Sequence, residues 1–98
     1  MRNPITKQKI EELRNNGVLI KMIDIRSPEE YQKLHIPGVI NISAETLTDE
    51  IQKFSKDETI VCICNHGKER SQKAAEAVYN LDFKNTYYLE GGTSGWLE

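Results

Sequence analysis

Apolar residues occur along this chain in two patterns, as continuous runs and as positions spaced three or four residues apart. The run from Val18 to Ile25 is almost continuously apolar, which is typical of a parallel strand buried on both faces. Further short runs predict three more strands, at residues 39–42, 59–64 and 86–89. The chain therefore predicts a sheet whose faces are covered by other elements.

The segment before the first strand has the end signals of a helix. Thr6 is a candidate N-cap, and a helix from there through Asn15 places Ile10 and Leu13 on the side that faces the core. Gly17 follows as the stop signal, since glycine readily adopts the left-handed conformation that ends many helices. We therefore expect one amphipathic helix before the first strand.

The sequence after the first strand predicts a second, short helix. Ser27 is a candidate N-cap, Pro28 suits the first helical position, and Glu30 completes a capping box. The helix is expected to end near His35, before Pro37-Gly38. These residues therefore predict that the second helix begins directly after the first strand.

Two later segments have the apolar spacing of helices that pack on a sheet. Leu47, Ile51 and Phe54 fit one helix face, with spacings of four and three. A further set has the spacing i, i+3, i+4 and i+7, at Ala74, Ala77, Val78 and Leu81. Strands that alternate with helices predict an α/β domain with a mainly parallel sheet of about five strands and helices on both faces.

Length and charge narrow the classes of function. A chain of 98 residues is long enough for one compact domain and too short for two, so residues 1–98 are expected to form a single domain. The net charge of −2 argues against nucleic acid or an anionic membrane as partner, because both bind basic surfaces. No apolar stretch has the length of a signal peptide or a membrane span, and we expect a cytoplasmic protein.

The two cysteines, Cys62 and Cys64, lie two residues apart in an apolar run. On a strand their side chains point the same way, with Cα atoms about 6.6 Å apart, which is the far limit for a disulfide. Two free thiols fit a reducing compartment. A zinc site is not expected, since there is no second pair of cysteines, and no other metal or cofactor is expected.

The segment after Cys64 carries the clearest chemical signal. Cys64 ends a strand, Gly67 permits an unusual backbone angle, and a helix begins about six residues after the cysteine. In this setting the loop N–H groups and the helix N-terminus converge on the sulfur and favour the thiolate, with Lys68 and Arg70 as the nearby cations. The same N–H groups would bind an anionic substrate. The predicted substrate-binding residues are Asn65, His66, Gly67, Lys68, Glu69 and Arg70.

A second interpretation of these cysteines is purely structural. A cysteine at a strand end is often a small buried hydrophobic residue. The strand, glycine-bearing loop and helix around Cys64 favour a reactive thiol instead. Cys62 lies deeper in the strand and is interpreted as a core residue, with a role as a resolving thiol left open.

Three segments of the chain, at residues 24–42, 64–71 and 89–96, together resemble the single-domain rhodanese family, and the resemblance covers nearly the whole chain. The first signature of that family resembles residues 24–31 followed by residues 35–42. Its active-site loop resembles Cys64-Asn65-His66-Gly67 followed by Arg70-Ser71, and its closing motif resembles residues 89–92 with Trp96. Each piece alone is moderately specific, and the three in this order and spacing are strongly specific.

The resemblance implies a thiosulfate sulfurtransferase. Cys64 would become a persulfide by attacking the outer sulfur of a small anionic donor such as thiosulfate, or of a protein persulfide, and would pass that sulfur to cyanide or a thiol. Asp24 would lie near the loop and steady it, and Arg26 would pair with a carboxylate such as Glu30. His35 and Trp96 are expected to be structural.

The loop departs from that family in length. Cys64 to Arg70 spans seven residues, whereas the usual rhodanese loop spans six. A Cys-x5-Arg loop resembles phosphatases and arsenate reductases of the same fold, in which the arginine can bind two oxygens of a tetrahedral anion. A third hypothesis, a non-catalytic binding module, conflicts with the presence of Cys64. Sulfurtransferase is the leading hypothesis, and the phosphatase or arsenate reductase is the alternative.

Overall fold

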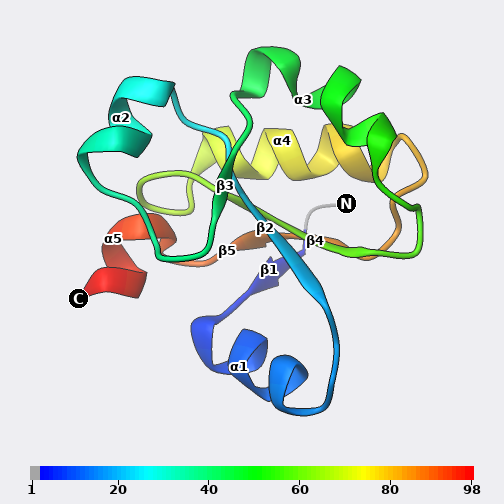
Figure 1. The fold of residues 1–98 in the computed structure, drawn as a ribbon, viewed down its shortest axis with the longest axis horizontal. Helices are drawn as coiled ribbons and strands as arrows, with labels where there is room; N and C mark the ends of the chain where they lie inside the picture. The colour runs from blue at the N-terminus through cyan, green and yellow to red at the C-terminus, as the bar shows by residue number, and fades with distance from the viewer. Residues whose placement is uncertain (1–2) are drawn as a thin grey trace.

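The computed structural model describes residues 3–98, which form one five-stranded sheet with helices around it (Figure 1). All neighbouring strands are parallel. The strand order is β1 (Pro4–Ile5), β5 (Thr86–Leu89), β4 (Thr59–Ile63), β2 (Ile20–Asp24) and β3 (Ile40–Asn41). The predicted parallel α/β sheet of about five strands is confirmed.

Helices cover both faces of this sheet, as predicted. Figure 1 shows α1 on one side of the strands and α3 and α4 on the other. None of the helices within residues 3–98 is long and apolar enough to cross a membrane. The helices are α1 (Lys7–Asn15), α2 (Pro28–Lys33), α3 (Ala44–Glu50), α4 (Glu69–Tyr79) and α5 (Gly92–Leu97).

Alternate residues of β4 supply the two halves of the core. Ile60 and Cys62 pack in the cluster that includes buried residues of α3 and α4. Val61 and Ile63 pack in the other cluster, which includes buried Ile10 of α1. Successive side chains of a strand point to opposite faces, and both cysteines point the same way, as predicted. The side they face is the one covered by α3 and α4.

The predicted caps of α1 and α2 are present. Thr6 accepts a hydrogen bond from the Lys9 N–H, and Gly17 follows α1 with φ of +83°. Ser27 and Glu30 form the reciprocal hydrogen bonds of a capping box at the start of α2. These local signals are sufficient because each needs only contacts between residues close in sequence.

Some element boundaries differ from the predictions. The first predicted strand is shorter, since β2 begins at Ile20, and Leu19 is 85% exposed. The helix expected to carry Leu47, Ile51 and Phe54 ends at Glu50 and continues as a 3-10 turn, Ile51–Lys53. The tighter turn still brings Phe54 against the core. Hydrophobic spacing indicates which side chains are buried and not which helical turn buries them.

The carboxyl ends of the central strands bring three loops together. Ile25 N donates to Ile63 O at 2.9 Å, which joins the segment after β2 to the end of β4. Thr93 N donates to Cys64 O at 2.9 Å, which joins α5 to the segment after β4. Ligands of open parallel sheets bind at this edge, so the fold places Cys64 where the sequence predicts a site.

Candidate active site

The loop after β4 is held by close contact with the turn between β5 and α5. Gly67 has φ of +68°, and a Cβ there would lie 2.5 Å from Leu89 O and 2.7 Å from Gly91 N. Gly92 has φ of +60°, and its Cβ would lie 2.5 Å from Cys64 O. Both positions therefore require glycine for space as well as for conformation.

The sulfur of Cys64 lies inside this loop and is surrounded by hydrogen-bond donors. Burial raises the pKa of the thiol, but hydrogen bonds from the Ser71 hydroxyl and from the backbone N–H groups of Ser71, Lys68 and His66 lower it. The net result is a Cys64 pKa below its ordinary value. Cys64 Sγ and Ser71 Oγ are 3.1 Å apart. The predicted convergence of N–H groups on the sulfur is present.

The two cations of the loop act differently from the prediction. The leading causes that lower the Cys64 pKa are hydrogen bonds, not the side-chain charges of Lys68 and Arg70. Both of these side chains are exposed. Backbone N–H groups are fixed close to the sulfur by the loop, whereas long side chains at the surface are screened by water.

A small pocket opens at the sulfur. Its volume is about 220 Å³, and it is lined by Cys64 and by five of the six predicted substrate-binding residues, Asn65, His66, Lys68, Glu69 and Arg70. The sixth, Gly67, is buried and packs against the β5–α5 turn. The Glu69 carboxylate turns along the helix to pair with Lys73 at 3.1 Å. The pocket can therefore admit a small donor beside the sulfur.

Arg70 lines this pocket and pairs with Glu30. Arg70 Nη2 donates to Glu30 Oε1 at 3.1 Å. Glu30 Oε2 accepts from Asn65 Nδ2 at 3.3 Å, so the same carboxylate touches both the loop and the first turn of α4. Hydrogen bonds from Arg70 and then from the Ser27 backbone lower the pKa of Glu30 to about 2.

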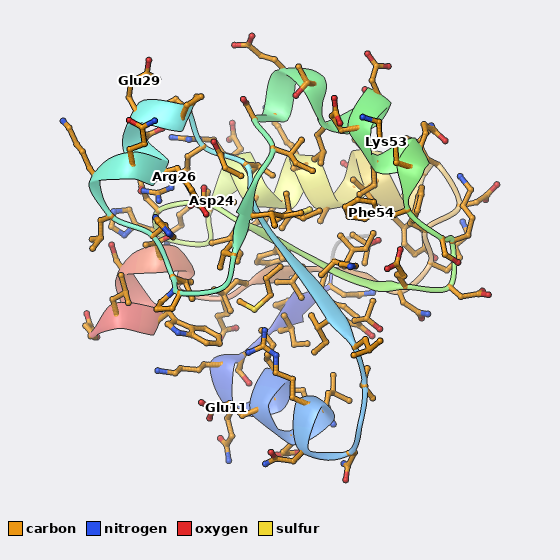
Figure 2. The ribbon with its side chains drawn as sticks, in the orientation of Figure 1. Glu11, Asp24, Arg26, Glu29, Lys53 and Phe54 are labelled. Carbon is orange, nitrogen blue, oxygen red and sulfur yellow. The ribbon has the colours of Figure 1, made fainter. Side chains whose placement is uncertain are left out.

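Asp24 and Arg26 form a buried ion pair beside the loop (Figure 2). Arg26 Nη2 lies 2.7 Å from Asp24 Oδ2, and Arg26 Nη1 donates to Asn65 Oδ1 at 2.8 Å. Arg26 pairs with a carboxylate, as predicted, but its partner is Asp24 and not the suggested Glu30, which pairs with Arg70. Asp24 is two residues from Arg26 and already buried, so it is the nearer partner for the buried guanidinium.

Cys62, His35 and Trp96 neither donate hydrogen bonds to the Cys64 sulfur nor line the pocket beside it. Cys62 is fully buried, and burial raises the pKa of its thiol to about 12. The ring of His35 stacks on Tyr31. Trp96 packs with the α1-side core and lies under the ammonium of Lys7. Within residues 3–98, no group of three or more acidic, cysteine or histidine side chains could hold a metal ion.

Two residues of the site were not singled out by the sequence. In the sequence analysis, Ser71 is named only as part of the motif Arg70-Ser71. Its position in the first turn of a helix that follows a reactive cysteine could have indicated that its hydroxyl lies near the sulfur. Glu30 appears only as a helix cap and a partner for Arg26. Its contact with Arg70, forty residues later, depends on how α2 and α4 meet at the sheet edge.

Comparison with known proteins gives one family for this arrangement. The profile of the Rhodanese-like domain matches residues 6–98. The chain is 34% identical over 92 residues to "Thiosulfate sulfurtransferase GlpE" of Ectopseudomonas mendocina, a match that covers 94% of this chain and 82% of that protein.

Solved structures agree with the fold. A rhodanese-related protein of Thermoplasma volcanium has 28% sequence identity and a TM-score of 0.81, covering 99% of this chain and 91% of that one. A protein of Rhodopseudomonas palustris, described as of unknown function and "Possible Tyrosine Phosphatase", has 25% identity and a TM-score of 0.83, covering 98% and 80%.

Proposed function

This chain belongs to the rhodanese-like family, and on that premise we propose that it is a sulfurtransferase with Cys64 as the sulfur-carrying nucleophile. The observation that supports the proposal most directly is the cradle of donors around the Cys64 sulfur. A lowered thiol pKa increases the fraction of thiolate, the form that attacks sulfur. The GlpE proteins with about one third identity are named for transfer from thiosulfate.

The proposed reaction has two displacement steps at sulfur. In the first, the Cys64 thiolate attacks the outer sulfur of the donor, the bond between the two donor sulfurs breaks, and sulfite leaves with the electron pair. In the second, an acceptor thiolate or cyanide attacks the outer sulfur of the persulfide, and Cys64 leaves as the thiolate. The loop N–H groups can stabilise the terminal negative charge of the persulfide between the steps.

The other supporting residues act through the loop. Arg26, held by Asp24, donates to Asn65 and so steadies the segment that follows Cys64. We propose that residues 1–98 work as one domain in a reducing compartment such as the cytoplasm, because both cysteines are free thiols and the reaction consumes a free thiol. The partners would be a small anionic donor and a thiol or cyanide acceptor, with a protein persulfide as a further donor.

Intact mass spectrometry after exposure to thiosulfate tests the proposal. The wild-type protein should gain one sulfur atom and lose it on addition of cyanide. Cys64→Ser should gain none while remaining folded, because serine is close in size and cannot form a persulfide. Cys62→Ala is the matched control, and it should still load, although the cavity lowers its stability by about 1 kcal/mol. Loading of Cys64→Ser, or loss of loading in folded Cys62→Ala, would refute the assignment.

Phosphate-ester hydrolysis or arsenate reduction is the second candidate, favoured by the seven-residue spacing from Cys64 to Arg70. The position of Ser71 beside the sulfur would serve a thiolate in either reaction. Against it, the acid of the loop, Glu69, is exposed and its carboxylate pairs with the ammonium of Lys73, which disfavours protonation of Glu69 and its use as a general acid. Turnover of an aryl phosphate by wild-type protein that fails to load sulfur would favour this second candidate.

A further inference from the structure

The carboxylate of Glu30 on α2 contacts two residues, Asn65 and Arg70, that line the pocket at the Cys64 sulfur. Its Oε1 accepts from Arg70 Nη2 and from Ser27 N, at 3.1 and 3.2 Å. Its Oε2 accepts from Asn65 Nδ2 at 3.3 Å. Two of these three contacts are made to residues that follow Cys64, so the charge of Glu30 is part of the site's surroundings as well as of α2.

This carboxylate is a fixed negative charge. The hydrogen bond from Arg70, followed by that from the Ser27 backbone, holds the pKa of Glu30 at about 2. Glu30 is therefore ionised at every pH at which a thiolate exists. Glu30 does not line the pocket at the sulfur, but an anion that contacts Arg70 there is close to this charge as well as to the donors of the loop.

Arg70 lines the pocket at the sulfur and also the adjoining cavity of about 450 Å³ that contains Glu30. The guanidinium already donates to Glu30, so part of its donor capacity and charge is used. A tetrahedral dianion binds best when a guanidinium donates to two of its oxygens. To obtain that contact, the dianion must compete with Glu30 for Arg70.

We propose that Glu30 is a specificity-determining residue of this site, which disfavours tetrahedral dianions and thereby favours sulfane-sulfur donors that carry a single negative charge. It acts on the substrate through Arg70 and through its own charge. This inference rests on the proposed function, since the donor it selects is the one that loads Cys64. It also applies to a phosphate dianion, which would meet the same competition.

Two donors of nearly equal shape separate the effect of charge from that of size. Thiosulfate is a dianion, and methanethiosulfonate replaces one of its oxyanions with a methyl group and is a monoanion. With each donor the Cys64 thiolate bonds to the outer sulfur and the donor S–S bond breaks. Sulfite leaves from the first and methanesulfinate from the second, each with the electron pair, so both reactions give the same persulfide.

Glu30→Gln is the informative variant because glutamine also completes a capping box and keeps an oxygen acceptor. The KM for thiosulfate should fall about three- to fivefold, the range expected for one exposed ion pair, while kcat stays unchanged. The fold decrease in the KM for methanethiosulfonate should be less than half of the fold decrease for thiosulfate. Glu29→Gln, one residue earlier, removes the same charge from the wall of the same cavity without removing a contact to Arg70, and it should change both KM values far less than Glu30→Gln does.

Coupling to Arg70 identifies the route of the effect. In an Arg70→Gln background, Glu30→Gln should change the KM for thiosulfate less than twofold, because the competition for Arg70 is absent and only the direct repulsion by the Glu30 charge remains. Equal effects of Glu30→Gln in both backgrounds would overturn the role of Arg70. A rise in the KM for thiosulfate in Glu30→Gln, or equal changes for both donors, would overturn the role of Glu30 in specificity.

A binding measurement tests Glu30 without sulfur transfer. Sulfate, a tetrahedral dianion, should slow the alkylation of Cys64 by iodoacetamide, and half-protection should need about three- to fivefold less sulfate in Glu30→Gln than in wild type at constant ionic strength. Unchanged protection would overturn the inference. If the wild type fails to load sulfur but this shift in protection appears, the proposed function fails and the effect of Glu30 on dianions stands.

Discussion

At the scale of single residues, the two cysteines of β4 and its following loop differ for a reason that lies outside the strand. Cys62 and Cys64 face the same side and are both buried, yet the Cys62 pKa is raised to about 12 and the Cys64 pKa is lowered. Burial alone opposes ionisation of both thiols. The donors of the loop and of Ser71 reach only Cys64, and they reverse the balance there.

Removing one of these donors should move the pH dependence of Cys64. A lowered pKa means that the thiolate, and with it the alkylation rate, persists at pH values below the ordinary thiol range and is lost as the pH falls through the pKa. In Ser71→Ala that loss should occur at higher pH, because the thiolate has one donor fewer. At pH 7 the rate of alkylation by iodoacetamide should fall about three- to tenfold.

Ser94→Ala is the control for this change. Ser94 is exposed and its backbone N–H, not its hydroxyl, contacts the loop at Asn65 O. The pH profile of Cys64 alkylation in Ser94→Ala should match that of the wild type. A Ser71→Ala profile that coincides with the wild type would mean that backbone N–H groups alone set the Cys64 pKa.

At the scale of elements, the loop between β4 and α4 and the turn between β5 and α5 act as one unit. Gly67 lies against the turn, and Gly92, the first residue of α5, lies against the loop. Backbone hydrogen bonds from Thr93 to Cys64 O and from Ser94 to Asn65 O join the same two segments. The shape of the cradle is therefore set by packing of backbone on backbone, which leaves no room for a Cβ.

Gly67→Ala should disrupt this unit. The variant combines a positive φ with a Cβ within 2.5 Å of Leu89 O, so the loop must shift, and sulfur loading of Cys64 should be lost. Gly38→Ala is the matched control, since Gly38 has φ of +83° with open space at its Cβ. It should cost about 1–2 kcal/mol from conformation alone and retain loading. Urea unfolding and mass spectrometry check both, and equal destabilisation by the two variants would contradict the packing argument.

At the scale of the whole molecule, the buried guanidinium of Arg26 holds the carboxyl edge of the sheet together. It pairs with Asp24 at the end of β2 and donates to Asn65 in the loop and to Leu34 O after α2. Arg26 is 5% exposed and Asp24 is 1% exposed. A buried charge of this kind is stable only while its partner remains.

Asp24→Asn should therefore be strongly destabilising, by about 3–5 kcal/mol in urea unfolding, because it leaves Arg26 charged and buried. Adding Arg26→Met to Asp24→Asn should recover part of this loss, since the unpaired charge is then removed. In urea unfolding, the wild type should be the most stable, the double variant should be intermediate, and Asp24→Asn alone should be the least stable. A double variant less stable than Asp24→Asn would mean that the contacts of Arg26 to Asn65 and Leu34 outweigh the unpaired charge.

The sequence by itself determined the features that depend on neighbours along the chain. The N-caps at Thr6 and Ser27, the buried strand before Cys64 and the glycine-bearing loop follow from local propensity and from periodicity. Their order is enough to predict a parallel α/β sheet with Cys64 at its carboxyl edge, because few topologies satisfy alternating strands and helices.

Only the tertiary structure decided which distant groups meet. Glu30 pairs with Arg70 rather than Arg26, and the two-residue strand β1 carries too little hydrophobic pattern to be recognised before it pairs with β5. The thiolate is favoured by the Ser71 hydroxyl and by N–H groups rather than by loop cations. Charge partners and donor directions are set by the three-dimensional approach of elements, and many partners are compatible with one linear pattern of charges.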